Sequence, residues 1–268
     1  MQKSFYDVGI SPFGPGFHAA PVPRNDPGFR KDPGAAEWLR WEEIFESAKR
    51  GNFDRTPELI DVYERGDPTL QGACRYLMAF AGSESCLERL HYRILERPYL
   101  LAHIDFCKSL IISARLAYMP AAIETYAGLS RQGMGELEMI PVELRCRLGN
   151  PGHELDDSHP VEDFARNAMS RYRELVDRFG SKQVSVFLGE KVAPELLAKQ
   201  LLSGDRLMFA PLRLVLEAFT GRNFSAVFAD RAPRPLPAAA LAEEFLDSGE
   251  GANYEPGVRY FWGHRISE

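Results

Sequence analysis

The chain has 268 residues, of which 38 are Asp or Glu and 32 are Lys or Arg, so the formal net charge is −6 with six neutral His. Hydrophobic residues make up 45% and charged residues 26%, which excludes wholesale disorder, a collagen-like repeat and a coiled-coil rod. The mild negative charge argues against nucleic acid as a partner, because non-specific binding to phosphates depends on Lys and Arg.

The apolar segments bear on localisation. Residues Met1 to Asp7 lack the basic start and apolar stretch of a secretory signal, and no window reaches the roughly 18 uninterrupted apolar residues of a membrane span. We therefore expect a cytoplasmic protein that makes no membrane contact.

The cysteines form no C-x-x-C pair and lie in apolar helical patterns. We expect all four to be buried thiols: Cys74, Cys86, Cys107 and Cys146.

Proline and glycine divide the chain into three parts. Residues 9–34 contain six prolines and five glycines, which predicts an extended arm over residues 1–34. Phe13, Phe17 and Phe29 favour an arm that lies on the protein surface. Residues 35–221 are predicted to be a helical repeat domain, and residues 222–268 a C-terminal extension docked on it.

The first two helices carry the clearest local signals. Trp38, Trp41, Phe45 and Ala48 recur at steps of three and four, which predicts a helix that stops at Gly51. Thr56-Pro57-Glu58 then offers a hydroxyl N-cap, a proline at the first helical position and an early acidic side chain. Further apolar stripes predict successive helices through Leu70–Phe80, Ile104–Ala114 and Phe164–Phe179.

Several of these helices close with an aromatic residue followed almost at once by glycine. The glycines, Gly82, Gly128, Gly180 and Gly221, are 46, 52 and 41 residues apart. In addition, Gly66-Asp67-Pro68 and Gly204-Asp205-Arg206 each lead into a helix that ends in such a glycine. The pattern predicts an all-α fold, either a HEAT-like α-solenoid or an irregular helical bundle.

The C-terminal part changes character. After Pro233, Pro235 and Pro237 a short helix is predicted around Ala238–Leu246, and the aromatic tail is predicted to form a short strand or an extended segment. Val184–Leu188 alternates and predicts either a second strand or the start of the helix through Leu201.

Ionisable side chains concentrate in one loop. Residues His153–His159 hold two imidazoles and three carboxylates, groups that ligate divalent metals, although their spacing matches no familiar site. The alternative is a solvated acidic loop that caps the helix beginning near Pro160. His91 and His103 are expected in the core or at its boundary. The sequence contains no nucleophile elbow and no phosphate or dinucleotide loop, so no catalytic residue and no cofactor is predicted.

Two segments resemble known proteins. Ala210–Gly221 resembles a HEAT-type repeat helix, and the tail Pro256–His264 is similar to the closing motif of helical immunity proteins of bacterial polymorphic toxin systems. The resemblance implies a cytoplasmic antidote that binds its cognate toxin, a basic protein where that toxin must hold phosphates, and blocks it. The partner-binding residues that it implies are acidic or aromatic: Glu154, Asp156, Asp157, Asp163, Tyr260 and Trp262.

Two other functions remain open. A general HEAT-like scaffold or adaptor would use the same surface for other proteins. A metal-dependent enzyme would use the His153–His159 loop.

Overall fold

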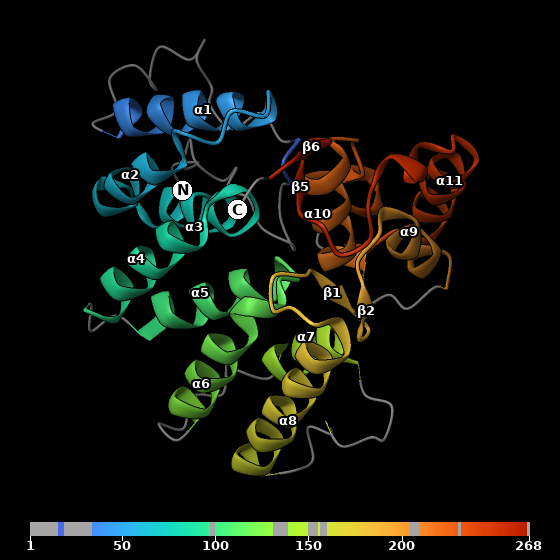
Figure 1. Ribbon diagram of the computed structural model, residues 1–268. Coiled ribbons are helices and arrows are strands. Elements are labelled where there is room, and N and C mark those ends of the chain that lie inside the picture. Colours follow the sequence, from blue (N-terminus) through green and yellow to red (C-terminus); the bar gives the residue numbers. More distant parts are fainter. Residues whose placement is uncertain are drawn as a thin grey trace. The chain divides into compact units, whose positions relative to one another are not determined.

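The computed structural model of the chain describes residues 16–18, 34–96, 100–130, 139–149, 155, 160–203, 209–229 and 232–266 (Figure 1). Helices account for 71% of these residues, and their strands form only two-stranded sheets, so the predicted all-α class is confirmed. No helix within these ranges has the length and apolarity needed to cross a bilayer.

The chain forms two compact units. Unit 1 comprises residues 1–90, 194–254 and 260–268, and unit 2 comprises residues 91–193 and 255–259. The predicted division after residues 34 and 221 stays a prediction, since compact units need not coincide with segments of distinct composition.

Helix α4 (Glu84–Leu95) crosses the boundary between the units. The remaining elements of unit 1 are α1 (Ala35–Lys49), η2 (Thr56–Glu58), α2 (Leu59–Arg65), α3 (Pro68–Ala81), α9 (Pro194–Ser203), α10 (Phe209–Thr220), η6 (Ser225–Val227), β3 (Phe228–Ala229), β4 (Ala232–Pro233), α11 (Pro235–Asp247), η7 (Glu250–Asn253), β5 (Tyr260–Phe261) and β6 (His264–Arg265). The remaining elements of unit 2 are α5 (Leu100–Ile112), η3 (Leu116–Tyr118), α6 (Met119–Ser130), α7 (Met139–Leu148), α8 (Val161–Phe179), β1 (Val186–Phe187) and β2 (Glu190–Lys191).

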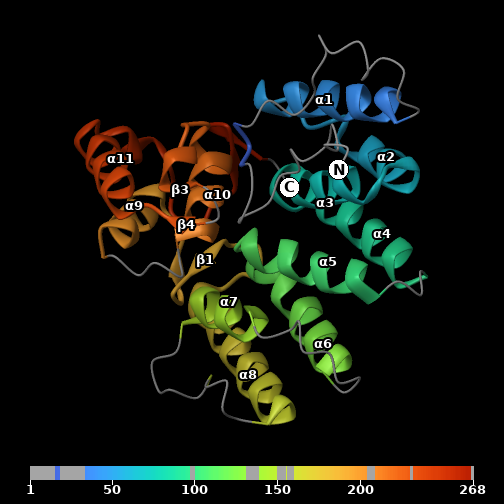
Figure 2. The ribbon, with the colours of Figure 1, turned by 180° about the vertical axis from the view of Figure 1, so that it is seen from behind.

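Unit 1 is built from helices that the apolar stripes predicted. Helix α1 buries Trp38, Trp41 and Phe45 and packs against α2 and α3, while α9 and α11 lie side by side in both views (Figures 1 and 2). Helix α3 starts as predicted, because the Asp67 carboxylate accepts hydrogen bonds from the N–H groups of Thr69 and Leu70 at 2.8 and 3.0 Å.

The prediction that Thr56 caps a helix is wrong. Thr56 is the first residue of η2, and α2 begins three residues later, at Leu59. The Thr56 hydroxyl donates to the carbonyl oxygen of Phe53 at 2.9 Å, and neither η2 nor α2 has a side-chain hydrogen bond at its N-cap position. Pro57 still lies in the first turn of this helical segment, as expected.

The predicted glycine stops are confirmed at three of four positions. Gly180 and Gly221 follow the ends of α8 and α10 with φ of 67° and 71°, and Gly82 caps α3 in an extended conformation. Gly128 lies inside α6, so its prediction is wrong. A glycine inside a helix lowers its stability by about 1 kcal/mol without ending it when packing holds the helix together.

Unit 2 packs its helices around buried aromatic and basic side chains. Tyr126 of α6 meets Phe164 of α8 edge to face at 5.6 Å. Arg147 of α7 is 1% exposed, lies over the Phe187 ring at 5.1 Å and donates from Nε to the carbonyl oxygen of Ile111 at 3.0 Å. Burial lowers the pKa of Arg147 to about 10 and raises the pKa of Glu143, one turn before it, to about 7.

Each unit contains a two-residue β-hairpin with positive φ at both turn residues. The segment predicted at Val184–Leu188 forms β1, and the turn Leu188–Gly189 joins it to β2 with φ of 51° and 75°. The predicted tail strand is β5, and the turn Trp262–Gly263 joins it to β6 with φ of 54° and 77°. Positive φ at both positions is the signature of a type I′ turn.

Both hairpin turns cap the C-terminal end of a helix in the same way. In each hairpin, the N–H group of the first turn residue donates to the carbonyl two residues before the end of the helix. The N–H group of the second turn residue donates to the carbonyl one residue before that end. In this way Leu188 and Gly189 cap α7, and Trp262 and Gly263 cap α10. The acceptor oxygens belong to Cys146 at 2.7 Å, Arg147 at 3.0 Å, Ala218 at 2.7 Å and Phe219 at 2.8 Å. Both helices end at a left-handed glycine, so units 1 and 2 share a helix–hairpin arrangement.

We predict that Gly189→Ala destabilises the protein and that Gly128→Ala does not. A Cβ at Gly189 would lie 2.8 Å from the Leu148 carbonyl oxygen, in a backbone with φ of 75°, whereas a Cβ at Gly128 would meet nothing within 4 Å. Chemical denaturation should show a loss of about 1–3 kcal/mol for Gly189→Ala. The control Gly128→Ala should gain up to about 1 kcal/mol. Equal effects of the two substitutions would contradict the turn geometry.

Candidate functional site

An open pocket of about 530 Å³ lies in unit 1 where the chain turns from α1 to α2. The loop between these helices supplies most of its lining, and the end of α3 and the residue after β6 complete it. The lining residues are Gly51, Asn52, Phe53, Asp54, Thr56, Pro57, Ala81, Ser83 and Ile266.

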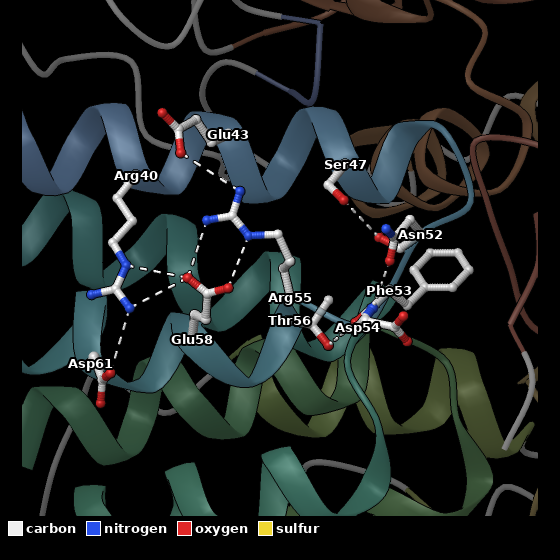
Figure 3. A network of polar contacts seen from close by, with 10 residues as sticks. All are labelled: Arg40, Glu43, Ser47, Asn52, Phe53, Asp54, Arg55, Thr56, Glu58 and Asp61. Carbon is white, nitrogen blue, oxygen red and sulfur yellow. Dashed lines mark hydrogen bonds and ion pairs between the residues drawn. The ribbon is translucent and has the colours of Figure 1, made fainter.

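Hydrogen bonds hold the backbone of this loop. The Asn52 N–H donates to the carbonyl oxygen of Ser47, whose hydroxyl in turn donates to the Asn52 carbonyl, both at 3.1 Å. The Asn52 side chain accepts from the Asp54 N–H at 3.1 Å (Figure 3). The loop therefore presents Asn52 and Asp54, both exposed, from a backbone with little freedom.

An ion-pair network joins α1 to the start of α2 beside the pocket (Figure 3). Arg55 donates to both carboxylate oxygens of Glu58, at 2.8 and 3.1 Å, and Arg40 approaches Glu58 at 3.4 Å and Asp61 at 3.5 Å. Arg55 also lies 3.6 Å from Glu43. The bidentate geometry fixes the direction of the Arg55 side chain, which a single contact would not do.

These contacts also set the charge of Glu58. The hydrogen bonds from Arg55, with a further contribution from Arg40, hold the pKa of Glu58 below its ordinary value. The pKa of Arg55 is raised, mainly by its hydrogen bond to Glu58. Both groups are therefore ionised at neutral pH.

The tail residues predicted to bind a partner pack largely within unit 1. Tyr260 is 8% exposed and meets Tyr254 edge to face at 5.0 Å. Trp262 is half-buried. Its ring centroid lies 4.9 Å from that of His18 and 5.5 Å from that of Phe45, and the Nζ of Lys49 lies 5.3 Å from the Trp262 ring centroid. Their role in partner binding stays a prediction.

Of the acidic residues predicted to contact a partner, three lie outside the described residues: Glu154, Asp156 and Asp157. Asp163 is described: it lies in the first turn of α8 in unit 2 and pairs with Arg166 at 2.9 Å. An acidic side chain there is favoured by the positive end of the helix dipole, so the position has a structural explanation.

Residues 16–18 of the N-terminal arm occupy a slot in unit 1 that the sequence did not reveal. Phe17 is 3% exposed, and its ring centroid lies 5.4 Å from that of Phe80 and 5.6 Å from that of Phe261. Its N–H donates to Glu217 Oε2 at 3.0 Å. The only sequence signal was an aromatic residue in a proline-rich arm, which predicts surface contact without saying where.

Glu217 is a buried carboxyl at the bottom of this slot. Burial raises its pKa to about 7, while Arg213 and the backbone N–H groups of Phe17 and Phe224 oppose the rise. Burial also lowers the pKa of His18 below its ordinary value, with Lys49 adding to the shift. Both groups therefore favour the neutral form more than they would in water.

We searched the described residues for metal-ligand clusters and reactive thiols. They contain no group of three His, Cys, Asp or Glu side chains placed to hold a metal. Burial raises the pKa of the Cys74 and Cys107 thiols, which keeps them protonated, while Cys146 is only partly buried, contrary to its prediction. Except for Leu155, the His153–His159 loop lies outside the described residues, so both of its interpretations, a solvated acidic loop and a metal site, stay untested.

His91 agrees with its prediction, since it stacks on Phe106 at 5.1 Å in unit 2.

None of the protein-family models, curated proteins or solved structures compared with the chain matches it.

We predict that Glu58→Gln lowers stability at neutral pH and has no effect in acid. The pKa of Glu58 is lower in the folded chain than in the unfolded one. The ionised carboxylate therefore contributes its full stabilisation of the fold above the unfolded pKa, near 4.5. This stabilisation is lost as the pH falls through the folded pKa. Denaturation at pH 7 should show a loss of no more than about 1 kcal/mol, because the pair is partly exposed. Glu88→Gln, on the exposed face of α4, is the control; a difference that persists unchanged at pH 3 would contradict the network.

Glu217→Gln should have the opposite pH dependence. The folded pKa of about 7 exceeds the unfolded value, so the folded chain binds the extra proton and wild-type stability falls as the pH rises from about 4.5 to about 7. Relative to the Gln variant, whose amide oxygen still accepts from Phe17, the wild type should lose up to about 3 kcal/mol across this range. Urea denaturation at several pH values measures this. A difference that does not change with pH would show that Glu217 is not buried as an acid.

Proposed function

We propose that this protein binds another protein through the surface around the α1–α2 pocket and acts as an immunity protein of a bacterial toxin system. The observation that carries the proposal is the open pocket of about 530 Å³, lined by a loop that hydrogen bonds hold in place. A pocket with a fixed backbone binds with a smaller entropy cost than one that must order on binding.

The charge around the pocket favours a basic partner. Residues 35–65 carry eight carboxylates and five cations, a net charge of −3, which is half of the formal charge of the whole chain. Asp54 is exposed on the pocket loop, and Glu43 and Asp61 lie in the neighbouring network. Complementary charge accelerates association and rejects acidic competitors.

The pocket also has an apolar side. Phe53, Pro57 and Ile266 line it together with the polar loop residues. A lysine or arginine side chain fits this combination, because its apolar stem can pack on these residues while its charged end reaches Asp54. We therefore expect a basic side chain of the partner at this position.

The assignment as an immunity protein rests on the resemblance of the tail Pro256–His264 to helical immunity proteins. The partner is then a toxin, and the protein protects the cell in which both are made. A general scaffold would bind through the same surface but would not protect against a toxin.

The test is co-expression with the product of the gene next to the one that encodes this chain. We expect the wild-type protein to restore growth and to bind that product, with an affinity that falls as salt rises. Asp54→Arg should weaken binding at least about 10-fold and abolish protection. Asp177→Arg, an exposed position on α8, is the matched control and should change neither.

Three outcomes separate the alternatives. Protection that Asp54→Arg leaves intact would overturn the assignment to this pocket. Binding without protection would favour a scaffold. Neither binding nor protection would overturn the proposed immunity function.

A further inference from the structure

The slot that holds residues 16–18 recognises a short segment in which glycine is followed by an aromatic residue at the start of a turn. A Cβ on Gly16 would collide with the carboxylate of Glu217, so that position accepts only glycine unless the carboxylate moves. The N–H of Phe17 donates to the same carboxylate. The Phe17 ring packs in an apolar site between α1, α3 and β5. Backbone recognition and a specific side-chain pocket are the two parts of a peptide-binding site.

Trp262, the turn residue of the β5–β6 hairpin, forms one wall of the slot. Its ring centroid lies 6.0 Å from that of Phe17 and 4.9 Å from that of His18. Trp262 has a φ of 54°, a left-handed conformation that is unfavourable for a residue with a Cβ. The contacts with the arm therefore help to hold a backbone that is unfavourable on its own.

The same hairpin continues into the α1–α2 pocket. The ring of His264, two residues after Trp262, lies against Gly51, where an added Cβ would be 2.9 Å from it. Ile266, two residues further on, lines the pocket. Only His264 and Arg265 separate the hairpin turn from Ile266, so the turn and this wall of the pocket are directly connected along the chain.

We propose that Gly16–Phe17–His18 is a latch, an internal ligand whose occupancy of the slot holds the β5–β6 hairpin and the pocket wall formed by Ile266 in place. Departure of the latch exposes the aromatic side of Trp262 and frees the hairpin turn. The pocket is that of the proposed function, but the latch is tested on the protein alone and its outcome does not depend on any toxin.

The test is amide hydrogen exchange in the full chain carrying Phe17→Ala. The Trp262 and Gly263 N–H groups, which donate to the C-terminal carbonyls of α10, should exchange at least about 10-fold faster than in the wild type. Amides within α5 and α8 of unit 2 should keep their wild-type rates. Tyr92→Ala removes an aromatic side chain that is 70% exposed and should change neither set.

Addition of the missing ligand distinguishes a latch from a core residue. A synthetic peptide of residues 12–22, added to the Phe17→Ala protein, should slow the exchange of Trp262 and Gly263 again. The same peptide with alanine in place of Phe17 should not. A phenylalanine that serves only as core packing would give no rescue by a peptide.

Gly16→Ala provides a second variant if Phe17→Ala does not fold. It displaces the Glu217 carboxylate and keeps the aromatic ring, so the hairpin amides should exchange faster while the fold is preserved. Hairpin exchange that stays at the wild-type rate in both variants would overturn the proposal. Rates that rise equally throughout the chain, with no rescue by the peptide, would also overturn it.

Discussion

The cap at the C-terminal end of α10 is the interaction on which the arrangement of unit 1 depends. A helix leaves its last carbonyl groups without partners, and here the turn of a β-hairpin from the end of the chain supplies two N–H groups to them. That single connection places Trp262 against the arm and leads the chain on to Ile266 at the α1–α2 pocket. The Trp262 wall of the slot and the Ile266 side of the pocket are consequences of how one helix end is satisfied.

In unit 2, too, the turn of a β-hairpin supplies N–H groups to the last carbonyl groups of a helix. The turn Leu188–Gly189 caps α7, and a left-handed glycine follows each capped helix. The two turns share a Phe-x-Gly sequence, Phe187-Leu188-Gly189 and Phe261-Trp262-Gly263. The repeated feature in the described part of this chain is therefore a helix closed by a hairpin, which differs from the repeat predicted from the spacing of the glycine stops.

The helices were predictable because their signals are local, whereas the sites depend on contacts between distant residues. Apolar periodicity predicted α1, α3 and α8. Asp67 predicted the start of α3, because an N-cap side chain accepts from N–H groups no more than three residues away. The prediction at Thr56 was wrong because the helical turn starts at Thr56 itself, and the local sequence does not fix a helix start to within one residue. Phe17 and Glu217 are 200 residues apart, and no periodicity links them.

The discontinuity of unit 1 has a consequence for how the chain is made. Its first segment leaves the ribosome long before α10 and the β5–β6 hairpin, and about 200 residues must be added between Phe17 and Glu217. At ordinary rates of translation this takes roughly 10–40 s, during which α3 lacks β5, and Phe45 of α1 lacks Phe261 and Trp262, as packing partners. Unit 2, nearly continuous over residues 91–193, can form in that interval. The N-terminal helices of unit 1 therefore wait longest for their packing partners, and exposed apolar surface in that interval favours aggregation.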